Sequence, residues 1–174
     1  GGLAVINRVE YLTLKARVDE ELENLKRLET GLRKLKLFPG IKAESLNGLP
    51  LEDEVSCRVI GSYLHDYYSG LEKVFIHVIK SFGESLPAGT QWHKELLGKM
   101  SLNIPGVRTA LISKQTAVKV DELRGFRHVF RNAYGFRIDP VREQALLTNL
   151  PAIAKSIKKD IQEFFKQMDQ IILE

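Results

Sequence analysis

The stretch that decides the fold is Leu123–Pro140, which reads LRGFRHVFRNAYGFRIDP. Plotted at about 100° per residue, its first part up to Tyr134 forms a helix with two unlike faces. The apolar face carries Leu123, Phe126, Val129, Phe130 and Ala133. The polar face carries, in order around the helix, Tyr134, Arg127, Arg131, Arg124, His128 and Asn132. We therefore expect a helix that buries one side in a core and presents the other to solvent or to a ligand.

Length and composition place this helix in an ordinary folded domain. A chain of 174 residues can bury a real hydrophobic core, and we expect a single domain over 1–174. Hydrophobic residues make up 44% and charged residues 28%, which excludes a disordered chain. The net charge of +4 permits a polyanionic partner. That charge is concentrated, because residues 124–142 contain five arginines and a single acid, Asp139.

The rare residues narrow the class of protein further. A single cysteine, Cys57, excludes a disulfide framework and fits a reducing, cytoplasmic compartment. The four histidines are scattered and no second thiol exists, so we expect no metal site and no cofactor. No apolar run reaches the roughly 18 residues that a membrane span needs, so we expect no membrane partner. The Gly1-Gly2-Leu3 start has no signal-like segment and looks like a remnant of cloning.

Helical periodicity dominates the whole chain and predicts an all-α bundle of four to five helices. The first helix is expected over 3–37, which is long for a small domain. We expect it either to bend near Thr30-Gly31 or to project towards a partner.

Capping residues and turns divide the rest of the chain. Thr90 is a candidate N-cap, and Asp139-Pro140 combines an N-cap with proline at the first helical position. Val55 and Val59 are assigned to the buried stripe of the second helix. Ser45–Pro50 is expected to be a loop. The further helices are predicted over 51–82, 90–100, from 107 or 114 to 134, and from 140 to 172.

The polar face of the motif helix has the residue types that metal-free RNA cleavage requires. Histidine can exchange protons near neutral pH, and arginine binds phosphate through a planar fork that stays charged. The alternative is a solvated helix face without chemistry. For the other histidines, His65, His77 and His93, we expect structural roles, with Trp92-His93 as a packing feature. Tyr67 and Tyr68 are expected in the core and at its rim.

The residues from Leu123 to Asp139 resemble the signature of the HEPN superfamily, specifically the HepT-like ribonuclease toxins of HEPN/MNT toxin–antitoxin pairs. The motif of that family is arginine, four to six residues, then histidine, commonly followed by one residue and tyrosine. Arg127 matches the arginine and Tyr134 matches the tyrosine. Segments 64–72 and 92–97 are also similar to one branch of these proteins, so the resemblance covers about residues 55–165.

The chain departs from this pattern at its centre, where Asn132 stands in the place of the usual histidine. An amide cannot act as a general acid or base near neutral pH. Three interpretations stay open. His128, one helical turn earlier, takes over proton transfer; or the protein is a natural variant with weak or lost activity; or the histidine was replaced deliberately so that a toxin could be expressed.

The resemblance also implies partners and a modification. Toxins of this type act as homodimers with the motif helices facing each other. Their partner is an MNT-type nucleotidyltransferase antitoxin that attaches AMP to the motif tyrosine, here Tyr134. The ordinary alternative for Tyr134 is a packed ring with a solvated hydroxyl at a helix end.

The leading hypothesis is therefore a toxin that cleaves RNA without a metal, and the alternative is a catalytically inactive HEPN-fold module that holds RNA or the nucleotidyltransferase. Arg127 is assigned to phosphate binding, His128 to proton transfer and Asn132 to substrate orientation. Arg124 and Arg131 are assigned to binding of the RNA backbone.

Overall fold

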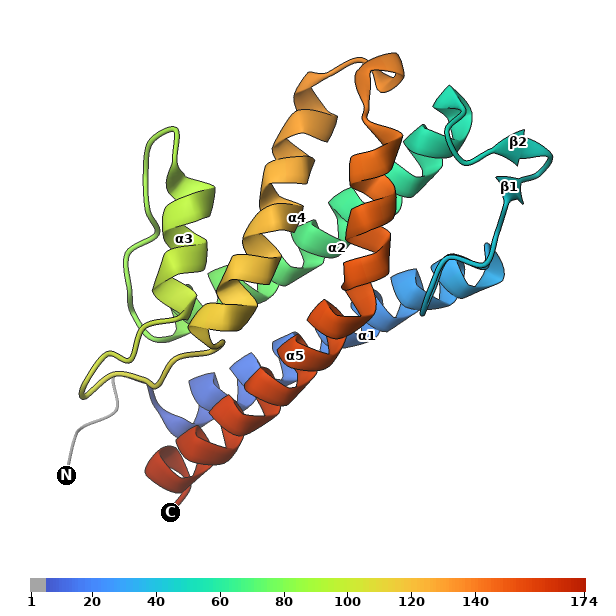
Figure 1. Cartoon of the computed structure of the whole chain (residues 1–174). Coiled ribbons are helices and arrows are strands. Elements are labelled where there is room, and N and C mark those ends of the chain that lie inside the picture. The colour runs from blue at the N-terminus through green and yellow to red at the C-terminus, as the bar shows by residue number, and fades with distance from the viewer. Residues whose placement is uncertain (1–5) are drawn as a thin grey trace.

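The computed structural model describes residues 6–174 and is an all-α bundle (Figure 1), as the sequence predicts. A short 3-10 helix, η1 (Gly135–Arg137), and a hairpin of two-residue strands complete it. The hairpin strands are β1 (Ser45–Leu46) and β2 (Leu49–Pro50). The five helices are α1 (Arg8–Lys34), α2 (Glu54–Ser81), α3 (Trp92–Met100), α4 (Lys114–Asn132) and α5 (Pro140–Ile172).

Helix α2 is the central element of the bundle. Its inner face is fully buried at Leu64, Tyr68, Leu71 and Phe75. Helix α1 runs along one side of α2, and α3 and α4 pack on another (Figure 1). Helix α5 changes direction midway, where Pro151 removes a backbone donor, so its first half lies beside α4 and its second half beside α1.

Helix α1 is one helix through Gly31, and it packs against α2 instead of projecting away. Asn7 caps it by accepting a hydrogen bond from the Glu10 backbone N–H at 2.8 Å. A Cβ at position 31 would lie 2.5 Å from the Tyr63 hydroxyl, so this glycine permits close approach of α2. The predicted start at residue 3 lies outside the described residues.

Three local predictions are wrong. Val55 and Val59 are 54% and 36% exposed, because the buried face at this end of α2 runs through Cys57 and Ile60. Thr90 lies in a turn, while Gln91 holds the N-cap position of α3 without a side-chain hydrogen bond. The expected loop at 45–50 contains the β1–β2 hairpin, whose Asn47-Gly48 turn has the positive φ angles that these residues tolerate.

None of the helices within residues 6–174 has both the length and the apolar character needed to cross a membrane.

Candidate functional site

A polar cavity of about 320 Å³ lies between α4 and the segment that begins α3. Five of the six residues predicted on the polar face of the motif helix line it, all except Tyr134, so the structure brings this face together with a second element. Among residues 6–174, no acidic side chain lines it. The lining residues are Thr90, Gln91, His93, Lys94, Arg124, Arg127, His128, Arg131 and Asn132.

Arg127 is held firmly against α2. Its Nε donates a hydrogen bond to the Ser69 Oγ at 3.2 Å, and its guanidinium carbon lies 6.0 Å from the centre of the Tyr68 ring. The side chain is half-buried, and the remaining N–H groups of its fork have no protein partner within residues 6–174. Arg127 can therefore present a fixed, unpaired set of donors to an anion.

The other cations of the cavity differ in how they are held. Arg124 forms an ion pair with Asp121, with 2.6 Å between Nε and Oδ1. Arg131 is exposed and has no ion-pair partner in the described chain. Lys94 adds a fourth permanent charge from α3. The cavity thus has a positive surface that suits phosphate groups.

His128 and Asn132 stand one turn apart at the end of α4. The Asn132 Nδ2 donates a hydrogen bond to the His128 backbone oxygen, one turn earlier, at 2.7 Å. The His128 ring is exposed and makes no hydrogen bond to residues 6–174. His128 is thus free to reach a ligand, while Asn132 already has a structural partner.

Tyr134 is outside the cavity, and its predicted place on the helical face is wrong. Helix α4 ends at Asn132, and Ala133 and Tyr134 are extended. The chain leaves the helix because Gly135 is buried and η1 packs on α2 before α5 begins. The Tyr134 ring is 70% exposed and stacks on Phe136 at 5.3 Å between ring centres.

Sequence reasoning missed His93 as a residue of this site. The ring does pack on Trp92, at 3.6 Å between centres, as predicted. It also lines the cavity, and its Nδ1 lies 2.6 Å from the Oε2 of Glu72. Glu72 is a buried acid on the apolar face of α2, and a buried carboxylate needs a hydrogen-bond donor. An acid at such a position in the sequence was therefore the signal that could have pointed to a partner for Glu72.

The remaining histidines lie elsewhere. His65 lies 3.1 Å from Asp66 and packs on Phe130 with 5.7 Å between ring centres. Burial lowers the pKa of His77 below its ordinary value. Neither residue lines the cavity. Within residues 6–174, no group of three His, Cys, Asp or Glu side chains is placed to hold a metal ion.

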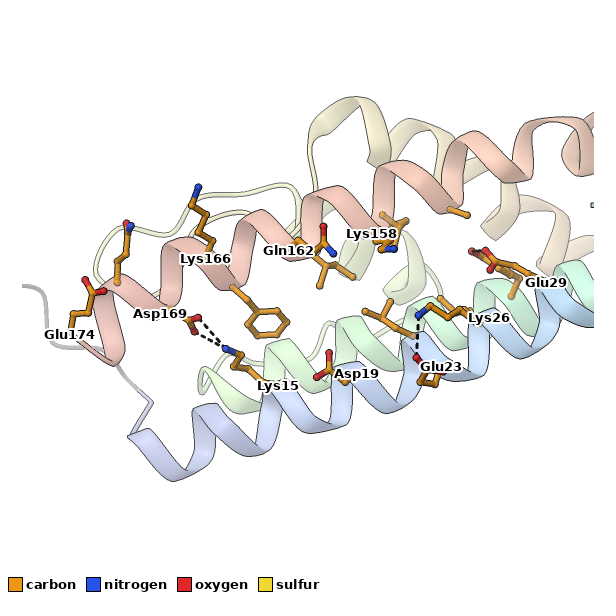
Figure 2. Close-up of a pocket in the computed structure, with 18 residues that line it drawn as sticks. Lys15, Asp19, Glu23, Lys26, Glu29, Lys158, Gln162, Lys166, Asp169 and Glu174 are labelled. Atoms are coloured by element: carbon orange, nitrogen blue, oxygen red, sulfur yellow. Dashed lines mark hydrogen bonds and ion pairs between the residues drawn. The ribbon is translucent and has the colours of Figure 1, made fainter. Parts of the chain in front are cut away.

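A larger cavity of about 810 Å³ separates α1 from the second half of α5 (Figure 2). Its charged rim mixes lysines with a similar number of acids, and Figure 2 shows two ion pairs among them, Lys15 with Asp169 and Lys26 with Glu23, at 2.9 and 3.2 Å. Apolar side chains such as that of Phe165 contribute to its lining. Charges that neutralise one another attract a polyanion weakly, so the α3–α4 cavity is the better phosphate site.

Comparison with known proteins identifies the family of the chain. The family model described as HepT-like protein matches residues 59–168, a segment that includes every residue lining the α3–α4 cavity. Searches of curated proteins and of solved structures found no match. Since the match covers more than half of the chain, this protein belongs to the HepT-like family of the HEPN superfamily.

Proposed function

We propose that the protein is the toxin of a HEPN/MNT toxin–antitoxin pair and that it cleaves RNA without a metal ion. The observation that carries the proposal is the α3–α4 cavity, whose described lining combines four cations and two imidazoles with no acidic side chain. Membership in the HepT-like family supports the same class of activity.

The cavity residues divide the chemistry among them. Arg127 binds the scissile phosphate and stabilises the charge that develops on its oxygens. Arg124 and Arg131 hold the neighbouring backbone of the RNA. His128 exchanges a proton with the reacting oxygens, which Asn132 cannot do.

The active unit is a homodimer. Large apolar side chains are exposed on α2, α4, η1 and α5, and exposed side chains of this kind favour a protein interface. Pairing two copies here places two motif helices near each other and enlarges the positive surface. These side chains are Val55, Val59, Val129, Phe136 and Val141.

An MNT-type nucleotidyltransferase neutralises the toxin by transferring AMP to Tyr134. Tyr134 is 70% exposed, and a modification site must be accessible in this way. Tyr134 follows Asn132 by two residues, so the added phosphate carries negative charge to the edge of the cationic surface. The added AMP then obstructs the approach of RNA and also lowers the positive potential that attracts it.

The nuclease assignment is tested by RNA cleavage in the presence of EDTA. We expect cleavage by the unaltered protein and a loss of about 10²–10⁴ in rate for Arg127→Ala and for His128→Ala. Arg27→Ala, an exposed arginine on α1 away from the cavity, is the matched control. Cleavage that survives both cavity substitutions contradicts the assignment.

A second function is favoured by one observation, the hydrogen bond that ties Asn132 to the end of α4. In that function the protein is an inactive HEPN-fold module that holds RNA or the nucleotidyltransferase. Asn132→His distinguishes the two, with Asn132→Gln as the control that cannot exchange a proton. Cleavage gained by the histidine variant alone, from an inactive parent, establishes the second function.

The modification is tested by intact mass after incubation with ATP and the nucleotidyltransferase. We expect the addition of AMP to the parent and none to Tyr134→Phe. An unchanged parent, with a transferase that is active on itself or on another substrate, counts against AMP transfer.

A further inference from the structure

Helices α2 and α3 meet at one buried carboxylate next to the α3–α4 cavity. Glu72 on α2 is only 6% exposed. Its Oε2 accepts a hydrogen bond from the Tyr68 hydroxyl at 2.8 Å and lies 2.6 Å from the Nδ1 of His93 on α3. A buried carboxylate with two such partners holds both of them in fixed positions.

The contact with Glu72 determines what the His93 ring can do. A carboxylate partner requires the proton on Nδ1, which leaves the lone pair on Nε2. Nε2 makes no hydrogen bond to residues 6–174, and the ring lines the cavity. Trp92 stacks on the ring and restrains its plane. His93 therefore offers a positioned proton acceptor at the cavity.

The charged surroundings of His93 come from all three packed elements. From α2 it meets Glu72, whose Oε2 also accepts the hydrogen bond of the Tyr68 hydroxyl; burial and Glu72 raise the pKa of that hydroxyl. From its own helix the nearest cavity residue is the cation Lys94. From α4 the cavity receives Arg124, Arg127, His128 and Arg131.

We propose that His93 is the general base of RNA cleavage in this cavity, that His128 is the general acid, and that Glu72 is a positioning residue for His93. The inference rests on the proposed ribonuclease function and assigns its two proton transfers to two imidazoles. Asn132 cannot supply either transfer, whereas α3 and α4 each contribute one histidine to the same cavity.

The reaction balances without any further reactant. His93 Nε2 takes the proton of the 2′-hydroxyl, and the 2′-oxygen forms a bond to the adjacent phosphorus. The bond from phosphorus to the 5′-oxygen breaks, and His128 gives a proton to that oxygen. The products are a 2′,3′-cyclic phosphate and a 5′-hydroxyl, with Arg127 stabilising the charged phosphorane between them.

Arg127 and His93 are placed relative to each other by the same turn of α2. Arg127 lies over the Tyr68 ring and binds Ser69, while Tyr68 and His93 share the Glu72 oxygen. The phosphate ligand and the proposed base thus lie on one rigid support, which is the arrangement that positional catalysis needs.

The experiment compares two substrates with leaving groups that differ in their need for an acid. The first is an RNA oligonucleotide, and the second is the 4-nitrophenyl ester of uridine 3′-phosphate, whose leaving group departs without protonation. His93→Asn keeps an N–H for Glu72 but cannot accept a proton, and His93→Gln is the second variant if the first does not fold. His65→Asn is the control, because it alters a histidine outside the cavity.

We expect His93→Asn to slow both substrates by about 10²–10⁴ and to abolish the fall in rate towards acid pH. His128→Asn should slow RNA cleavage by a similar factor and affect the nitrophenyl ester much less. Parent-like rates and pH dependence in the folded His93 variants overturn the inference while leaving the nuclease intact. A His93 defect confined to RNA overturns its assignment as the base. A parent that cleaves no RNA overturns both the inference and the proposed function.

Discussion

Two buried glutamates on neighbouring helices show how differently the same side chain can be used. Glu72 on α2 is 6% exposed and has Tyr68 and His93 as partners. Glu143 on α5 is 0% exposed, and neither of its oxygens has a hydrogen-bond partner within residues 6–174. Burial raises the pKa of Glu143 to about 8, and Asp139 adds to the rise.

The two glutamates are almost equally buried, and they differ in whether hydrogen-bond donors reach the carboxylate. Cys57 lies beside Glu143, but its thiol points to the backbone oxygens of Leu51 and Glu52, at 3.6 and 3.7 Å. Without a donor, a carboxyl group in the core keeps its proton and packs as a neutral side chain. With donors, as at Glu72, it can orient a reactive group. We infer that the functional carboxylate is the one with a hydrogen-bond partner that lines a cavity.

The largest effect is expected from removing the charge of Glu72. Glu72→Gln can no longer fix the proton on His93 Nδ1 or stabilise the protonated ring, so RNA cleavage should fall by about 10²–10⁴. Glu143→Gln is the matched control and should cleave RNA at the parent rate. Equal rates for the two variants would remove the distinction between the glutamates.

The second effect is a pH-dependent change in stability at Glu143. Because its pKa of about 8 in the folded chain lies above the ordinary 4.5, the folded chain retains a proton that the unfolded chain loses between these values. Stability therefore falls as pH rises from about 5 to 8 and levels off above that range.

The side chain introduced by Glu143→Gln cannot titrate. As pH rises through this window, the free energy of unfolding of the variant relative to that of the parent should therefore increase by about 1.4 kcal/mol per pH unit. Urea unfolding at several pH values measures the gain. Glu163→Gln, an exposed acid of the same helix, serves as control. A difference between Glu143→Gln and the parent that stays constant with pH would show that Glu143 is ionised in the core.

The sequence predicted those parts of the site that lie along one helix. Periodicity alone placed the cavity residues Arg124, Arg127, His128, Arg131 and Asn132 on one face of α4. It failed at Tyr134, because the end of α4 is decided by the packing of η1 on α2. It also failed at Glu72 and His93, which are 21 residues apart and pair across two helices. Pairings of this kind depend on tertiary packing, which periodicity does not contain.

The smallest effect is expected when Glu72 keeps its charge but loses one of the groups that orient it. Tyr68→Phe removes one donor, at 2.8 Å, but leaves the carboxylate in contact with His93. The lost hydrogen bond should lower the free energy of unfolding by about 1 kcal/mol and RNA cleavage by roughly tenfold at most. Tyr67→Phe is the control, since this buried hydroxyl binds Glu29 on α1, away from the polar cavity. A loss in Tyr68→Phe as large as that in Glu72→Gln would mean that the hydroxyl, and not the carboxylate alone, holds His93 in its reactive position.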